Sequence, residues 1–181
     1  PPPVCTEEDG IRDWQYCLVG SEMCIRDRAR LHVEVLNEAT ADIDPARMRL
    51  HLCWGNYEGP HDHDVGLERI LPTVLQARPS TILFEAANPR HAHEWEVWQG
   101  AEIPDDTVLA PGVIMSTTNL VEHPRHVAQL LRPYVDLVGA DRVLASTDCG
   151  FGTFAGIGRV DPDVVGKQLR SLREGADLLG A

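Results

Sequence analysis

Basic residues are scarce in this sequence. Lysine and arginine together number 16, against 28 aspartate and glutamate residues, so the formal net charge is −12 at pH 7 with histidine neutral. No run of lysine or arginine interrupts this balance, and a chain of this charge repels the phosphates of nucleic acids. We therefore expect no nucleic-acid partner.

Long apolar runs are also missing. The longest have the length of a strand, far below the roughly 20 residues that a membrane-spanning helix needs. The proline-rich, acidic start lacks the apolar stretch of a secretory signal. We expect a protein that works in the cytoplasm without a membrane partner. With 181 residues, 43% of them hydrophobic, the chain has enough apolar material for one good-sized core.

The segment Leu18–Arg28, LVGSEMCIRDR, does not look like evolved protein sequence. It resembles the translation of a transposase adapter used in sequencing libraries. We therefore treat residues 1–28 as a segment of uncertain origin and residues 29–181 as a partial catalytic domain. Residues 1–28 carry three more acidic than basic residues, so the remainder keeps a net charge of −9. It also keeps two of the five cysteines, Cys53 and Cys149, which indicates ligands, a nucleophile or core packing rather than a disulfide framework.

Helix-like and strand-like segments alternate from residue 29 onward. Apolar strands are predicted near residues 50, 82, 111 and 144, and each is followed by a loop and a segment with helical periodicity. The predicted helices cover residues 30–43, 65–77, 90–99, 122–139 and 161–179. A β-loop-α unit that repeats about every thirty residues indicates a parallel α/β fold.

Residues capable of chemistry gather where the predicted strands end. His51 and Cys53 end the first strand, Glu85 ends the second, and Asp148 and Cys149 follow the fourth. A (β/α)8 barrel carries its active site at this face, although a doubly wound sheet would do the same. The chain holds about half of the eight units of a full barrel. We therefore expect the C-terminal half of a (β/α)8 TIM barrel.

The spacing of these residues suggests a metal site. Residues two apart in a strand face the same side of the sheet, so His51 and Cys53 could bind one ion together. Glu85 and Cys149 would reach the same edge from neighbouring strands. Imidazole, thiolate and carboxylate donors favour Zn²⁺. The alternatives are that the cysteines pack in the core and that Glu85 caps a helix or pairs with Arg90.

Other potential ligands lie in polar, loop-like stretches. The segments HDHD at His61–Asp64 and HAH at His91–His93 have ligand chemistry but no nearby thiol. We expect their side chains to be solvated, with a place at the mouth of the site as the alternative. Trp54, Trp95 and Trp98 are expected to pack in the interior rather than stack on a substrate.

Four segments carry a resemblance to a known family: HLCWGNYEGP, LFEAANPRHAHEW, PGVIMSTTNLVEHP and RVLASTDCGFGTF. Together they resemble the C-terminal catalytic barrel of the cobalamin-independent methionine synthases, especially the short single-barrel members, over residues 29–181. In that family the zinc ligands are the His and Cys of H-x-C, a Glu that ends the next strand, and the Cys of D-C-G. The resemblance therefore implies that His51, Cys53, Glu85 and Cys149 bind Zn²⁺.

The resemblance also implies an activity. A member of this family is a methyltransferase that moves a methyl group from a methyl donor to a small-molecule thiol similar to homocysteine. Asp148 would orient His51, and Asn119 and Glu122 would contact the substrate. The oligomeric state is left open.

One departure from the family pattern keeps alternatives open. After P-G-V the family has a D-x-H-S stretch with a proton-donating histidine, whereas Met115 and Thr117 stand here at the positions of the Asp and the His. A related zinc enzyme that alkylates a thiol with another electrophile, such as an epoxide, is the first alternative. An inactive half-barrel fragment that binds metal without turnover is the second.

Overall fold

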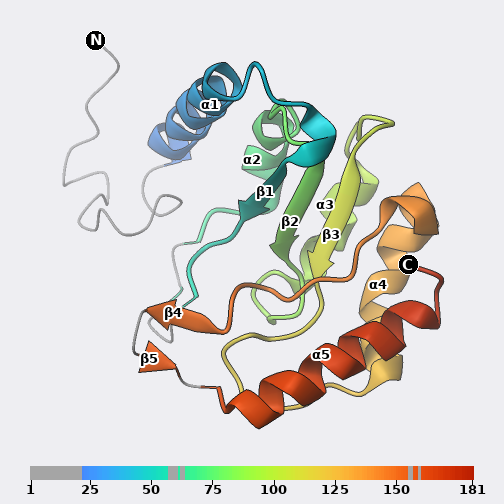
Figure 1. The fold of residues 1–181 in the computed structure, drawn as a ribbon. Coiled ribbons are helices and arrows are strands. Elements are labelled where there is room, and N and C mark those ends of the chain that lie inside the picture. Colours follow the sequence, from blue (N-terminus) through green and yellow to red (C-terminus); the bar gives the residue numbers. More distant parts are fainter. Residues whose placement is uncertain (1–21, 57–60, 62–63, 155–156, 159) are drawn as a thin grey trace.

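A parallel sheet of three strands forms the centre of the fold (Figure 1). The computed structural model describes residues 22–56, 61, 64–154, 157–158 and 160–181. The strands β1 (Arg49–Leu52), β2 (Thr81–Glu85) and β3 (Val108–Gly112) lie side by side in chain order. Parallel neighbours need a crossover between them, and helices α2 (Leu67–Val74) and α3 (Trp95–Gln99) lie in the two connections. The predicted parallel α/β layout is confirmed.

Three longer helices complete the described part of the chain: α1 (Glu22–Ala39), α4 (Pro124–Val138) and α5 (Pro162–Asp177). Single 3-10 turns cover Pro45–Arg47, Ala92–Glu94 and Ala140–Arg142. Helix α4 is followed by Gly139, the last residue of the predicted helix 122–139, whose φ of 86° stops the helix without strain. Helix α1 runs across residue 28, and the proposed division of the chain at that point stays a prediction.

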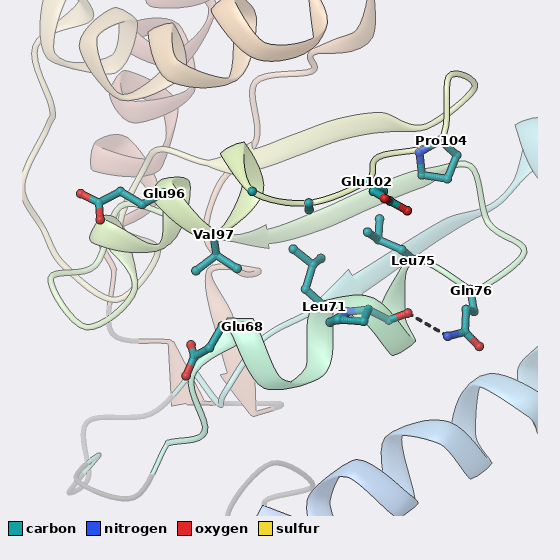
Figure 2. A pocket seen from close by; sticks show the side chains of 11 residues that line it. Glu68, Leu71, Leu75, Gln76, Glu96, Val97, Glu102 and Pro104 are labelled. Atoms are coloured by element: carbon teal, nitrogen blue, oxygen red, sulfur yellow. Dashed lines mark hydrogen bonds between the residues drawn. The ribbon is translucent and has the colours of Figure 1, made fainter.

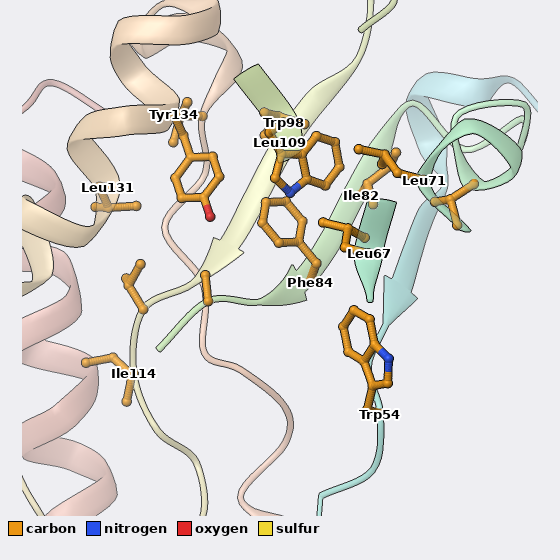
Figure 3. Close-up of a cluster of buried hydrophobic side chains, with 14 of the residues drawn as sticks. Trp54, Leu67, Leu71, Ile82, Phe84, Trp98, Leu109, Ile114, Leu131 and Tyr134 are labelled. Atoms are coloured by element: carbon orange, nitrogen blue, oxygen red, sulfur yellow. The ribbon is translucent and has the colours of Figure 1, made fainter. Parts of the chain in front are cut away.

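Helices cover one face of the sheet, and the core lies between them. The side chains of Ile82, Phe84 and Leu109 point to this face and are at most 2% exposed. Phe84 stacks on Trp98 of α3 with ring centroids 4.4 Å apart, and meets Tyr134 of α4 edge-on at 5.4 Å (Figure 3). The predicted packing role of Trp98 is confirmed, since its side chain is fully buried.

The opposite face of the sheet carries the residues of interest. The register pairs His51 of β1 with Leu83 of β2, and Leu83 with Ala110 of β3, so these three side chains form a row across that face. His51 is exposed and Leu83 is half-buried. Glu85 lies on the same face, two residues beyond Leu83. This face, on which none of the described helices packs, therefore presents polar side chains at its carboxyl end.

The predicted strand near residue 144 is only partly formed. It runs parallel to β3, and two isolated bridges join the pair, Leu109 with Val143 and Gly112 with Ser146. Pro111 lies between these bridges and has no N–H to donate, so the ladder lacks one hydrogen bond there. The prediction of a continuous strand is wrong in this respect, although the segment still delivers the residues after it to the carboxyl edge of the sheet.

A short antiparallel pair follows this segment and was not expected from the sequence. Its strands are β4 (Gly152–Phe154) and β5 (Ile157–Gly158). Among the described residues, no helix combines the length and the apolar character required to cross a membrane.

Candidate metal site

Three side chains converge at the carboxyl edge of the sheet. His51 lies in β1 one residue before its end, Cys53 directly follows the strand, and Cys149 follows the segment that runs beside β3. One ligand atom from each lies within 4.8 Å of the ligand atoms of the other two. Both cysteines are free thiols, and Cys149 is 8% exposed. One imidazole nitrogen and two sulfurs are a donor set that suits zinc, and this cluster could hold a metal ion.

A hydrogen bond between the two thiols shifts their pKa values in opposite directions. The Cys149 thiol donates to the Cys53 sulfur, and this bond, helped by His51, lowers the pKa of Cys53 to about 4. The same bond, together with burial, raises the pKa of Cys149. The hydrogen bond to Cys53 also raises the pKa of His51. Without metal the site therefore holds one thiolate beside one thiol, and a metal ion that bound both sulfurs would displace the remaining proton.

Glu85 lies directly behind this cluster and is 3% exposed. Its Oε1 atom lies 3.7 Å from the sulfur of Cys149 and accepts a hydrogen bond from the backbone N–H of Trp54 at 3.2 Å. Its Oε2 atom accepts from the Asn88 side chain at 2.7 Å and lies 3.3 Å from a guanidinium nitrogen of Arg90. The alternative that Glu85 pairs with Arg90 is thus present. Its role as a fourth metal ligand stays a prediction.

Burial raises the pKa of the Glu85 carboxyl group, and the hydrogen bond from Trp54 opposes this effect. Trp54 itself is 3% exposed, and its indole N–H donates to the carbonyl of Val65 at 2.8 Å. The expected packing role of Trp54 is therefore confirmed. It has a second role that the sequence did not reveal, because its backbone holds one oxygen of Glu85.

Asp148 fixes the loop that follows β2. Its carboxylate accepts the backbone N–H groups of residues 86–88 at 2.9 to 3.1 Å, and the Asn88 side chain at 3.2 Å. Burial raises the pKa of Asp148, and these hydrogen bonds oppose the effect. Because Cys149 is the next residue, the contacts of Asp148 join the loop after β2 to the cysteine. The predicted orientation of His51 by Asp148 stays a prediction.

Asn119 and Glu122 lie in the loop between β3 and α4. The side-chain oxygen of Asn119 accepts a hydrogen bond from the backbone N–H of Asp161, at the start of α5, at 2.8 Å. The Oε1 atom of Glu122 accepts from the backbone N–H of Met115 at 2.9 Å. These contacts organise the loop, and neither side chain belongs to the lining of the small cavity beside Cys149. Their contact with substrate stays a prediction.

That cavity has a volume of about 50 Å³, and its lining includes Glu85, Asp148 and Cys149. Thr117 also lines it, so the position where the family has its histidine lies beside the candidate metal site. The neighbouring Ser116 accepts a hydrogen bond from the backbone N–H of Cys149 at 3.2 Å. The loop after β3 therefore contributes directly to the site.

The histidine-rich segments are less solvated than the sequence suggests. His91 is 3% exposed and stacks on Trp54 with ring centroids 3.8 Å apart. The ring nitrogen Nδ1 of His61 lies 3.0 Å from Asp64, and both side chains are about nine-tenths buried. The prediction of solvated side chains is wrong for these residues, because stacking and hydrogen bonds to carboxylates offset the cost of burial. It is confirmed for His93, which is exposed, whereas residues 62 and 63 lie outside the described part of the chain.

A wider groove of about 730 Å³ lies elsewhere, between α2 on one side and α3 with the segment that follows it on the other (Figure 2). Leu71, Leu75 and Val97 form its apolar part, with Glu68 and Glu96 among the polar residues. None of the four predicted metal ligands lines it. The chemistry suggested by the sequence is therefore located at the sheet edge rather than in this groove.

Comparisons with known proteins agree with the fold. The B12-independent methionine synthase from Shewanella sp. W3-18-1, solved in complex with selenomethionine, is similar in structure with a TM-score of 0.51. The match has 17% sequence identity and covers 83% of this chain and 46% of that chain. The fold is similar to that of a TIM-barrel enzyme. The resemblance to methionine synthase indicated by the sequence motifs is therefore confirmed at the level of the fold.

A curated relative is the 2-hydroxypropyl-CoM lyase of Xanthobacter autotrophicus (strain ATCC BAA-1158 / Py2), which is 25% identical. The match covers 65% of this chain and 38% of the lyase. No family model matches the sequence. The chain spans less than half the length of either similar protein.

Proposed function

We propose that this chain carries the metal site of a zinc-dependent enzyme that transfers a methyl group to a small-molecule thiol, such as one similar to homocysteine. The convergence of His51, Cys53 and Cys149 at one edge of the sheet is the observation that carries the proposal. In the reaction a sulfur–carbon bond forms, the bond between the methyl group and its donor breaks, and the thiol proton leaves to solvent.

The residues present fit zinc. Two sulfurs and an imidazole would bind the ion, with Glu85 as the fourth ligand, whose Oε1 atom already faces the sulfur of Cys149. Bound Zn²⁺ would lower the pKa of a thiol substrate, so that the sulfur is held as a nucleophilic thiolate at neutral pH. Ser116 and Asp148 would keep Cys149 in place through their backbone hydrogen bonds.

We also propose that the sheet is the C-terminal half of a barrel. The strands follow one another in parallel order, and the face that carries His51 lacks a helical cover among the described residues. The chain also spans less than half the length of the two similar proteins. In such an arrangement the methyl donor and much of the thiol substrate would be bound by the other half.

Addition of a thiol to another electrophile, such as an epoxide, is the second candidate. The thiolate sulfur would then open the ring, and a proton would pass to the ring oxygen. Two observations favour it: Thr117 lies beside the site where the family has a histidine, and a 25% identical relative is a 2-hydroxypropyl-CoM lyase. The site chemistry at the metal would be the same for both candidates.

Zinc content of the purified full chain tests the proposal. We expect about one zinc per chain by elemental analysis, and a strong loss in the Cys149→Ala variant, because one of the two sulfurs is removed. Product analysis by mass spectrometry, with homocysteine and a methyl donor or with a thiol and an epoxide, then separates the two reactions. A folded chain without zinc would contradict the proposal, whereas zinc binding with no product in either assay would support the inactive fragment.

A further inference from the structure

Arg90 lies between two buried carboxylates. Its Nη1 atom lies 2.7 Å from Asp64 Oδ2, and its Nη2 atom lies 3.3 Å from Glu85 Oε2. The side chain of Asp64 is 10% exposed and that of Glu85 is 2% exposed. The planar guanidinium group can serve both partners at once because its nitrogens point in fixed, different directions.

The two oxygens of Glu85 consequently have different surroundings. Oε2 is held by Asn88 at 2.7 Å and by Arg90. Oε1 faces the sulfur of Cys149 at 3.7 Å and has a hydrogen bond of 3.2 Å from the backbone of Trp54. One oxygen is therefore turned toward the cluster of metal-binding side chains, and the other is turned toward the guanidinium group.

Asp64 is itself held in place. The Nδ1 atom of His61 lies 3.0 Å from Asp64 Oδ2, and the Nε2 atom of His91 lies 3.5 Å from the same oxygen. His91 stacks on Trp54, whose backbone N–H reaches Glu85. These contacts form a closed ring of interactions that begins and ends at Glu85. Arg90 is one member of this ring, so its guanidinium group is held in one position.

We propose that Arg90 is a positioning residue for Glu85. With Asp64 behind it, Arg90 fixes Oε2 and leaves Oε1 as the single carboxylate oxygen available to a metal ion. The inference rests on the proposed zinc site, and adds that a residue outside the ligand set determines how Glu85 binds. Partners of metal ligands of this kind typically contribute about 10- to 100-fold to metal affinity.

The test is a double-mutant cycle on zinc affinity, measured on the full chain by competition with a chromophoric chelator. We expect Arg90→Met to weaken zinc binding by about 10- to 100-fold in the wild-type background. In the Glu85→Gln background, the same substitution should have little further effect, because the group through which Arg90 acts is already altered. Arg90→Lys should lose less affinity than Arg90→Met but should not reach the wild-type value, since one ammonium group cannot reproduce the two directed contacts of the guanidinium group.

Arg142→Met is the matched control. Arg142 is also half-buried and donates to backbone carbonyls, those of Val138, Pro104 and Asp105, at the other end of the segment beside β3. Its removal should leave zinc affinity within about twofold of the wild type, because it has no contact with the ligands. Cobalt substitution gives a second readout: the visible absorption of the Co²⁺-loaded chain should change in Arg90→Met and not in Arg142→Met.

The outcomes separate this inference from the proposed function. If the wild-type chain binds zinc and Arg90→Met binds it with the same affinity, the role of Arg90 is overturned and the proposed function is not. An equal loss in the wild-type and Glu85→Gln backgrounds would also overturn it, because Arg90 would then act through the fold. A folded wild-type chain that binds no zinc would overturn both the proposed function and this inference.

Discussion

A β-carbon on Gly112 would lie 2.5 Å from the Cα atom of Asp148. Gly112 ends β3, and Asp148 lies on the neighbouring parallel segment, so two backbones approach closely beside the candidate metal site. Ala86 reinforces this junction, since its N–H reaches both the carbonyl of Gly112 and the carboxylate of Asp148 at 3.0 Å. A residue without a side chain is required where the three segments meet.

Gly112→Ala should therefore push Asp148 and Cys149 away from the loop after β2. We expect the free energy of unfolding to fall by about 1–3 kcal/mol, as for other overpacked sites, and zinc affinity to fall with it. Urea denaturation and chelator competition measure the two effects. Gly100→Ala is the control, because a β-carbon there meets only the carbonyl of Val97 at an ordinary 3.7 Å. Equal stability of both variants would contradict the close approach.

Cys53 should be reactive at low pH in the metal-free chain. Since its pKa is lowered to about 4, the thiolate form predominates above that pH, and alkylation by iodoacetamide should change little between pH 6 and 8. An ordinary thiol becomes roughly 100-fold more reactive over the same two pH units. Cys149, whose pKa is raised, should remain slow. Peptide mapping by mass spectrometry assigns each modified cysteine.

The Cys149→Ser variant tests whether the Cys149 thiol lowers the pKa of Cys53. The thiol that donates the main hydrogen bond to Cys53 is then replaced by a shorter hydroxyl, so the pKa of Cys53 should rise and its alkylation should regain a steep dependence on pH. A flat pH profile in Cys149→Ser would show that another group keeps Cys53 ionised.

Local patterns were sufficient to predict most of the fold. Helix α5 begins at Pro162 after its N-cap Asp161, where the predicted helix 161–179 starts, because caps depend on neighbours within a few positions. Helix α4 begins at Pro124, two residues after the predicted start at residue 122. The strand near residue 144 was less predictable: the effect of Pro111 depends on which neighbour its missing N–H would have faced. The strand register decides which neighbour Pro111 faces, and the register depends on contacts between residues far apart in the sequence.

The same distinction applies to the site. His51 and Cys53 could be placed on one face from their spacing alone, and the structure brings both close to Cys149. The pairing of Arg90 with Glu85 was among the alternatives drawn from the sequence. Its contact with Asp64 could not be predicted, because Asp64 lies 26 residues away in the sequence and no periodic pattern links them. Asp148 was predicted for the site, but its contacts with the loop after β2 bridge about sixty residues.

The ionisation of Tyr134 should affect stability only at high pH. Burial raises its pKa above the value of about 10 that it has in an unfolded chain, so it stays neutral in the folded protein. Stability is then unaffected below pH 10 and falls above it, by up to about 1.4 kcal/mol per pH unit, as the unfolded chain ionises. Tyr134→Phe should remove this part of the slope in urea denaturation between pH 9.5 and 11. An unchanged slope would contradict the burial of the hydroxyl group.

Gln168 should matter more than its distance from the cysteines suggests. Its fully buried amide nitrogen reaches the carbonyls of Met115, Thr118 and Leu120, and so holds the loop that carries Ser116 beside Cys149. Gln168→Leu would leave these carbonyls without their donor, and we expect it to lower the free energy of unfolding by about 1–3 kcal/mol.

The control for this prediction is Gln129→Leu on α4, where the side chain is exposed and the expected change stays within about 0.5 kcal/mol. Zinc affinity should also fall in Gln168→Leu, because Ser116 would no longer be held against the backbone of Cys149. Chelator competition under conditions where both variants remain folded measures this effect. A destabilised Gln168→Leu variant with wild-type zinc affinity would show that the loop after β3 supports the fold without shaping the metal site.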